Sequence, residues 1–484
     1  MTTQTEKDYG PIARQVEAVA DTIWDMASNV WTFAELGMEE KQSSSYESAV
    51  LEKNGFTISD RGIGGIDTSW IATYGSGTPV IGILVEFDAL PDLGNEPVAT
   101  KTPRKDGVTN GHGCGHNLIG SGAIGAALAL KAQMEKESIP GTLKVFGCPA
   151  EELLSGKNFM AKAGAFKGLD ACLHWHPADV NTVWNINSTA ASDFWFEWHG
   201  ITAHAGAAPW DGRSALQAAQ LFLHGVDMMR EHILPTARMH YIITEGGNAV
   251  NVVPDYAKVV FRYRGHNAED VLKNVEWVKD IAKGAALATQ TKVETTALDA
   301  CYDCLPNQTL ADRMMAHIHR LGPCEWSDEE QAFAKTMQKE VGVPEDGLAT
   351  IISPDPKGAA FGASSDVGDV SYNTPTMGAI ISSWPRRVPP HQWGCTACTG
   401  MSIGRKGVLK AAHVLAATGL ELFTDAELRS AAQAEFDDRT GGKPYQSLCE
   451  KDGPVGGHRP EHHEGHDQAL MGISEMATNK ENSK

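Results

Sequence analysis

The segment GHGCGHNLIGSG, residues 111–122, places three residues that can bind a metal on alternate positions. They are His112, Cys114 and His116, and glycines separate them. Imidazole nitrogen and thiolate sulfur are common ligands of zinc and related metals. Glycine lets the backbone bend and approach other groups closely. The residue types alone leave three interpretations: a metal site, a reactive cysteine, or a flexible turn with incidental polar residues.

Three short apolar segments elsewhere in the chain are predicted as strands. They lie within residues 79–91, 141–152 and 168–177, and each ends in polar residues. Continuous apolar runs are typical of parallel strands that are buried on both faces. Helix-like stretches at 120–136 and 157–166 lie between them, and this alternation favours a βαβ arrangement.

Side chains that can do chemistry follow all three predicted strands. Asp88 follows the first, Glu151 and Glu152 follow the second, and His176 closes the third. Because ligands of open α/β sheets bind beyond the carboxyl ends of the strands, we expect these residues at one location. One glutamate could bind a metal while its neighbour acts as a general base. A cysteine–histidine nucleophile is the alternative, but it does not account for the paired glutamates.

The sequence pattern changes near residue 191. From there to residue 305 the predicted order is strand, helix, strand, strand, helix, strand, which is typical of ferredoxin-like domains. We interpret residues 191–305 as a domain inserted into a catalytic domain formed by residues 1–190 and 306–440. Residues 441–484 are interpreted as a polar C-terminal tail, which contains the histidine-rich segment 456–467.

Composition narrows the class of protein. The formal net charge is −20, with 61 acidic and 41 basic residues, which argues against nucleic-acid or anionic membrane partners. No run of 18 apolar residues is present, so we expect no membrane span. The nine cysteines are scattered, and the N-terminus lacks the pattern of a secretory signal. These features favour a reducing, cytoplasmic location.

A series of motifs resembles the M20 family of metallopeptidases and amidohydrolases. The resemblance covers about residues 15–440 and is strongest to the amidohydrolase branch of that family, which includes p-aminobenzoyl-glutamate hydrolases. The wider family usually has histidine before aspartate in the first motif, whereas this chain has Glu86 before Asp88. This departure fits the branch that uses a cysteine ligand, here Cys114. The motifs are, in order, EFDALP, GHGCGHNLIGSG, GCPAEE, WHP, GITAHAGAAPWDGRSAL, GGNAVNVVP, SSDVGDVS and PPHQWGCTACTGMSIGRKG.

The resemblance implies a zinc-exopeptidase-like fold: an α/β domain with a mixed, largely parallel sheet flanked by helices, and an inserted ferredoxin-like βαββαβ domain. It implies one or two divalent ions per subunit, manganese or zinc, with cobalt also compatible. Within CLHWHP, residues 172–177, His176 is assigned in preference to His174. The implied metal ligands are Cys114, His116, Glu152, His176 and His391.

The resemblance also assigns roles beyond metal binding. Glu151 would activate the water and later protonate the leaving amine, and Asp88 would orient a ligand. His204 would reach into the site of a partner subunit and stabilise the oxyanion, which implies a homodimer formed through the inserted domain. Asn251 and Arg264 would contact the substrate, the arginine through a carboxylate.

The implied function is metal-dependent hydrolysis of the amide of an N-acyl or N-aroyl amino acid, with p-aminobenzoyl-glutamate as an example. Metal-activated water would be the nucleophile. Two alternatives remain open from the residues. One is hydrolysis of another C–N bond, as in aromatic amine deamination or cleavage of an indole-acyl amino acid. The other is a non-catalytic metal-binding subunit of a hetero-oligomer.

Overall fold

The computed structural model describes residues 10–455, and its central element is a seven-stranded sheet in the order β1-β2-β4-β3-β5-β13-β6. Strands β4, β3, β5 and β13 run parallel, and antiparallel strands flank them on both sides. The predicted, largely parallel sheet is therefore confirmed. The strands are β1 (Thr57–Arg61), β2 (Trp70–Ser76), β3 (Val80–Val85), β4 (Gly141–Gly147), β5 (Ala171–Ala178), β6 (Thr182–Val183) and β13 (Thr376–Ser382).

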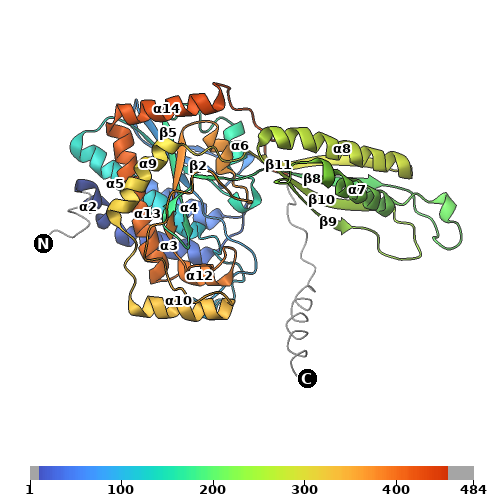
Figure 1. The fold of residues 1–484 in the computed structure, drawn as a ribbon, viewed down its shortest axis with the longest axis horizontal. Coiled ribbons are helices and arrows are strands. Elements are labelled where there is room, and N and C mark those ends of the chain that lie inside the picture. Colours follow the sequence, from blue (N-terminus) through green and yellow to red (C-terminus); the bar gives the residue numbers. More distant parts are fainter. Residues whose placement is uncertain (1–9, 456–484) are drawn as a thin grey trace, which may run out of the picture. The chain divides into compact units, whose positions relative to one another are not determined.

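Helices cover both faces of this sheet, which is why the central strand β3 is apolar and almost entirely buried (Figure 1). On β3, Ile83 joins the large core beneath α5 and α13, while Leu84 joins a separate core on the opposite face with residues of α6 and α11. Alternate strand residues thus point into two hydrophobic layers. These helices are α5 (His116–Glu137), α6 (Lys157–Lys162), α11 (Val367–Ser371) and α13 (Ser402–Thr424).

The remaining helices surround this framework. Helix α10 begins with a capping box between Ser327 and Glu330, in which each side chain binds the backbone of the other residue. The Gly/Ser-rich composition of residues 362–371 predicts a loop, but this segment contains the short helix α11. The helices are α2 (Pro11–Ala18), α3 (Ala20–Phe33), α4 (Lys41–Lys53), α9 (Gln308–Leu321), α10 (Asp328–Val341), α12 (Trp393–Thr399) and α14 (Ala426–Thr440).

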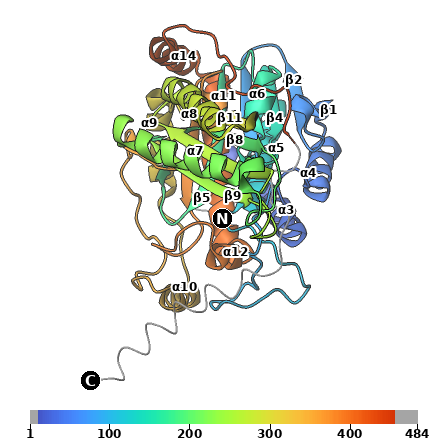
Figure 2. The same ribbon diagram turned by 90° about the vertical axis from the view of Figure 1, so that its right-hand side faces the viewer.

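A second, four-stranded antiparallel sheet has the order β11-β8-β10-β9, which is the strand order of a ferredoxin-like βαββαβ unit. Helices α7 and α8 lie side by side along it (Figures 1 and 2). This unit has its own core, to which Phe196, Trp198 and Phe222 contribute. Its elements are β8 (Ala190–His199), α7 (Ala215–Met229), β9 (Arg238–Glu245), β10 (Tyr256–Gly265), α8 (Ala268–Thr289) and β11 (Lys292–Cys301).

The first part of the predicted C-terminal tail packs against the rest of the chain. The Tyr445 hydroxyl donates to Asp369 Oδ1 at 2.6 Å, and Cys449 is buried. The histidine-rich segment 456–467 lies outside the described residues. Among the described residues, no helix is both long enough and apolar enough to cross a membrane.

Helix α5 begins at His116, earlier than the predicted start at residue 120. Its first turns lie very close to the segment after β3. A Cβ atom at Gly120 would lie 2.8 Å from the backbone oxygen of Glu86 and would also contact Glu47 Oε1. Glycine is therefore required for a close approach that brings His116 next to the residues after β3.

We expect Gly120→Ala to lower the free energy of unfolding by about 1–3 kcal/mol, because the added methyl group overpacks a buried contact. Urea denaturation at equal metal loading measures the change. Gly284→Ala is the matched control, since Gly284 lies inside α8 with no neighbouring atom within 4 Å. The control should raise stability by about 0.5–1 kcal/mol. Equal effects in the two variants would contradict the close-packing argument.

Candidate metal centre

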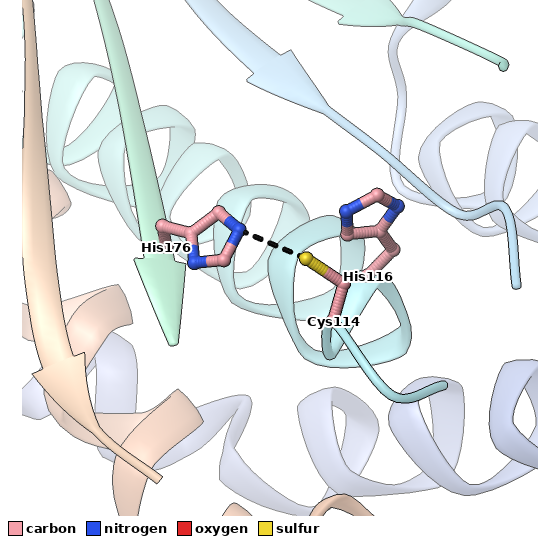
Figure 3. A group of neighbouring side chains, drawn as sticks. All are labelled: Cys114, His116 and His176. Carbon is pink, nitrogen blue, oxygen red and sulfur yellow. Dashed lines mark hydrogen bonds between the residues drawn. The ribbon is translucent and has the colours of Figure 1, made fainter. Parts of the chain in front are cut away.

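Three of the predicted ligands, Cys114, His116 and His176, lie together (Figure 3). Cys114 Sγ lies 3.3 Å from His176 Nε2. Gly115 between the first two has a φ of 80°, a left-handed conformation that favours glycine. This residue turns the chain from the loop into α5, so that Cys114 and His116 point into the same region.

Glu152 and His391 complete the donor set. The two adjacent glutamates lie in the 3-10 turn η2 (Glu151–Leu153), which is flanked by two left-handed residues. Glu152 Oε2 lies 3.3 Å from His391 Nε2. Donor atoms of Cys114, Glu152 and His391 form one group, and donor atoms of His116, Glu151 and Glu152 form another. Within each group, all donor atoms lie within 4.8 Å of one another. The structure therefore brings together all five predicted ligands, from four separate parts of the sequence.

Hydrogen bonds leave one nitrogen of His116 and one of His176 available. The Nδ1 atom of His116 lies 2.7 Å from Asp88 Oδ1, and its Nε2 atom faces the carboxylates. His176 Nδ1 donates to the Pro177 carbonyl at 2.6 Å, which leaves Nε2 facing Cys114. Partners of this kind fix the tautomer and orientation of histidines that bind metals.

The unsatisfied atoms of the site fit a bound cation. His116 Nε2 and Glu152 Oε1 are buried and have no hydrogen-bond partner among the described residues. Burial and the nearby Asp88 raise the pKa of Glu152 to about 7, even though His116 opposes this shift. Burial and Glu152 also raise the pKa of the Cys114 thiol. A divalent ion would offset these costs and satisfy both orphaned atoms, so the donor set fits a divalent metal.

Glu151, the predicted base, lies beside these donors. Its Oε2 atom is 3.8 Å from His116 Nε2, and 13% of its side chain is accessible. Burial, together with the negative charges of Glu86 and Asp366, raises the pKa of Glu151 well above its usual value. A carboxyl group of this kind can hold and release a proton close to bound substrate.

A buried ion triad, whose pairing the sequence does not predict, lies next to these donors. Lys157 Nζ lies 2.7 Å from Glu86 Oε1 and 2.6 Å from Asp366 Oδ1. Asp366 also accepts the backbone N–H of Lys157 at 2.7 Å. The other oxygen of Glu86 lies 3.6 Å from His116 Nε2, so the triad ends at the metal centre. The sequence offers little signal for it, because Lys157 has the pattern of an ordinary helical residue.

Three further residues lie close to the site without belonging to its donor groups. His112 Nε2 lies 3.0 Å from the Val30 carbonyl, and His112 Nδ1 accepts the Asn117 N–H at 3.3 Å, so it stabilises the loop. His174 is buried beside Gly378 and belongs to no donor group among the described residues. Glu40 accepts the Ala150 N–H at 2.8 Å and so holds the turn before Glu151.

Two predicted residues of the ferredoxin-like unit, His204 and Asn251, lie on loops outside its four strands. His204 is exposed, and its Nδ1 accepts the backbone N–H groups of Gly206 and Ala207. Asn251 lies on the neighbouring loop, where its carbonyl accepts the Ala205 N–H. Neither joins a donor group in the part of the chain that the structure describes. Arg264, on β10, lies closer to the site. Its guanidinium donates to Ser364, which is two residues before Asp366 of the ion triad.

Comparison with known proteins defines the class to which this site belongs. Residues 189–290 match the M20 peptidase dimerisation domain. The chain is 36% identical over 464 residues to the B subunit of p-aminobenzoyl-glutamate hydrolase from Escherichia coli (strain K12), covering 90% of this chain and 96% of that protein. The chain belongs to the M20 family of metallopeptidases and amidohydrolases, whose members act on amide bonds.

One further relative and two solved structures are also similar to this chain. Mouse Xaa-Arg dipeptidase is 30% identical over 64% of this chain and 70% of that protein. A dinuclear metal-binding M20 peptidase of Bacillus subtilis has the same fold, with a TM-score of 0.55 and 18% identity over 84% of this chain and 99% of that one. A putative aminohydrolase of methicillin-resistant Staphylococcus aureus has a TM-score of 0.63 and 17% identity over 86% and 100% of the two chains.

We expect Lys157→Met to lower the free energy of unfolding by about 3–5 kcal/mol, because it leaves two buried carboxylates without their counter-charge. Urea denaturation at equal metal loading measures this loss. The control is Lys283→Met, which removes an exposed pair with Asp280 at 2.9 Å and should change stability by less than about 0.5 kcal/mol. A similarly small change in both variants would show that the triad does not stabilise the site.

Proposed function

We propose that this M20 enzyme hydrolyses the amide bond of an N-aroyl or N-acyl amino acid, with p-aminobenzoyl-glutamate as the reference substrate. The observation that carries the proposal is the position of Glu151 beside five convergent metal donors. The name of the relative that is 36% identical supports this choice of substrate. A non-catalytic subunit would have no need of a buried carboxyl group beside its metal.

The proposed ligands of the metal are Cys114, His116, Glu152, His176 and His391. A divalent ion held by them would polarise the amide carbonyl and make a water molecule more acidic. Sulfur, nitrogen and oxygen donors together suit zinc or manganese, with cobalt also compatible. Asp88 fixes the ring of His116 and also accepts the Glu152 N–H at 3.0 Å, so one carboxylate positions two ligands.

Glu151 has the role of a proton carrier in this proposal. It takes a proton from the attacking water and returns it to the leaving nitrogen, which then departs as an amine. Its largely buried position and raised pKa support this role. Arg264 and Asn251 are proposed to bind the substrate, with the guanidinium of Arg264 facing a carboxylate. No carboxylate of the described residues lies within ion-pair distance of Arg264, which leaves its charge available.

His204 is proposed to act from a partner subunit. It is exposed, belongs to a segment that matches the dimerisation domain, and does not join the metal donors of its own chain. In a homodimer, the His204 imidazole would donate a hydrogen bond to the developing oxyanion of the neighbouring site. A hetero-oligomer is the alternative, since two relatives are named as different subunits of one hydrolase. We also propose a cytoplasmic location, which the nine unpaired cysteines support.

Hydrolysis of a related C–N bond is the second candidate function. Indole-3-acetyl-aspartic acid hydrolase of Enterobacter agglomerans is 29% identical over 50% of this chain and 57% of that protein. A panel of aroyl-glutamates, acyl-aspartates, indole-acyl amino acids, dipeptides and aromatic amines, tested on the manganese- or zinc-loaded protein, distinguishes these reactions. No turnover on any of them would favour a binding subunit.

We expect Glu151→Gln to lower kcat by about 10²–10⁴-fold, because the variant cannot accept the proton of the water. Its metal content, measured by elemental mass spectrometry, should equal that of the wild type. Cys114→Ala is the contrasting variant, which should lose metal as well as activity. Substantial turnover by Glu151→Gln would exclude the assigned base.

The partner role of His204 predicts complementation between two inactive variants. Glu151→Ala and His204→Ala homodimers should both be nearly inactive. After dissociation and mixing in equal amounts, about a quarter of the wild-type activity should return, since random pairing yields one complete site in each mixed dimer. Mixing without dissociation is the control. Absence of recovery in verified mixed dimers would place His204 outside the site of the partner subunit.

A further inference from the structure

We propose that Trp184 and Phe361 form an aromatic wall beside the metal centre that selects substrates with a flat aromatic acyl group. This inference rests on the proposed function and adds the residues that determine its specificity. Trp184 lies between β6 and β7 (Ile186–Asn187), and Phe361 follows β12 (Ala359–Ala360).

The wall begins at a proposed metal ligand. The rings of Trp184 and His176 lie 5.2 Å apart, centroid to centroid, with an interplanar angle of 43°. Trp184 also packs edge-on against the buried His174 at 6.0 Å. Its backbone N–H donates to the Gly378 carbonyl of β13 at 2.7 Å. The indole is therefore held rigidly next to the side chain that would bind metal.

Phe361 extends the wall towards solvent. Its ring lies 6.0 Å from that of Trp184 in an edge-to-face arrangement of 78°. His176 and Trp184 are half-buried, whereas Phe361 is 41% exposed. A single exposed aromatic residue is common on protein surfaces. Phe361 differs because its ring contacts Trp184, whose ring contacts His176, so the three rings run from the surface to the candidate metal centre.

Contacts at both of its ends hold the segment that carries Phe361 in place. Parallel pairing of β12 with β7 holds its start, and the Phe361 N–H donates to the Asn187 carbonyl at 2.9 Å. Three residues later, Ser364 accepts a hydrogen bond from Arg264. Two residues further on, Asp366 pairs with Lys157 beside the metal centre. Short connections therefore link the aromatic wall, the proposed anion-binding arginine and the metal site.

Such a wall discriminates between acyl groups by shape. An aromatic ring can pack on the indole and against the edge of the phenyl group, and both geometries are favourable for aromatic pairs. A small aliphatic acyl group, such as acetyl, would bury much less of the same surface. The amino-acid half of the substrate would bind elsewhere, so the wall should affect acyl preference alone.

The test compares N-benzoyl-glutamate with N-acetyl-glutamate on the metal-loaded full chain. We expect Phe361→Leu to lower kcat/KM for the benzoyl substrate by about three- to tenfold, with the acetyl substrate unchanged. Phe361→Tyr retains the ring and should keep the wild-type preference. Trp277→Leu is the matched control, because Trp277 on α8 has a similar exposure of 40% and should affect neither substrate.

Trp184→Leu should have the same selective effect as Phe361→Leu, with metal content measured to show that the centre is intact. An equal loss for both substrates, or no loss for either, would overturn the inference. Calorimetric binding of the two acyl-glutamates to wild type and Phe361→Leu tests the wall independently of turnover. If the wild type hydrolyses neither compound, the proposed function fails, while a selective loss of benzoyl binding would still support the wall.

Discussion

Asp88 makes the two hydrogen bonds on which the metal centre depends. One carboxylate oxygen fixes the ring of His116 at the start of α5, and the other accepts the backbone N–H of Glu152 in the turn after β4. Asp88 itself follows β3, so a single buried side chain joins three elements at the edge of the parallel sheet. His116 and Glu152 are therefore directed at a common point by one shared partner.

The second constraint is electrostatic. Four carboxylates, those of Glu86, Asp88, Glu151 and Glu152, gather around one buried imidazole, and burial makes their charges expensive. Lys157 supplies a fixed positive charge from one side, and a divalent ion would supply the rest. Although burial opposes ionisation of Glu86, Lys157 and His116 lower its pKa, so Glu86 remains an anion beside the centre. The site is therefore organised to need a cation.

The segment from Phe361 to Asp366 connects this centre with the proposed aromatic wall. Along six residues the chain passes from an exposed phenyl group, through the hydrogen bond between Ser364 and Arg264, to the buried carboxylate that binds Lys157. Backbone hydrogen bonds from Phe361 to Asn187 and from Thr189 to Ala363, both 2.9 Å long, hold this segment against the chain at and after β7. A substitution in this segment would thus affect both substrate recognition and the charge balance of the metal site.

The sequence by itself determined the fold class, the ferredoxin-like order of the second sheet and a set of candidate metal donors. Apolar periodicity and strand-end chemistry are local properties, and the ordered motifs carried the resemblance to the M20 family. Only the tertiary structure decided which donors face one another and what supports them. Lys157, Asp366 and Glu40 act through contacts between distant segments, and Trp184 meets Phe361 only because β7 pairs with β12. Such contacts leave no local pattern, because their energy comes from burial and charge pairing that exist only in the folded chain.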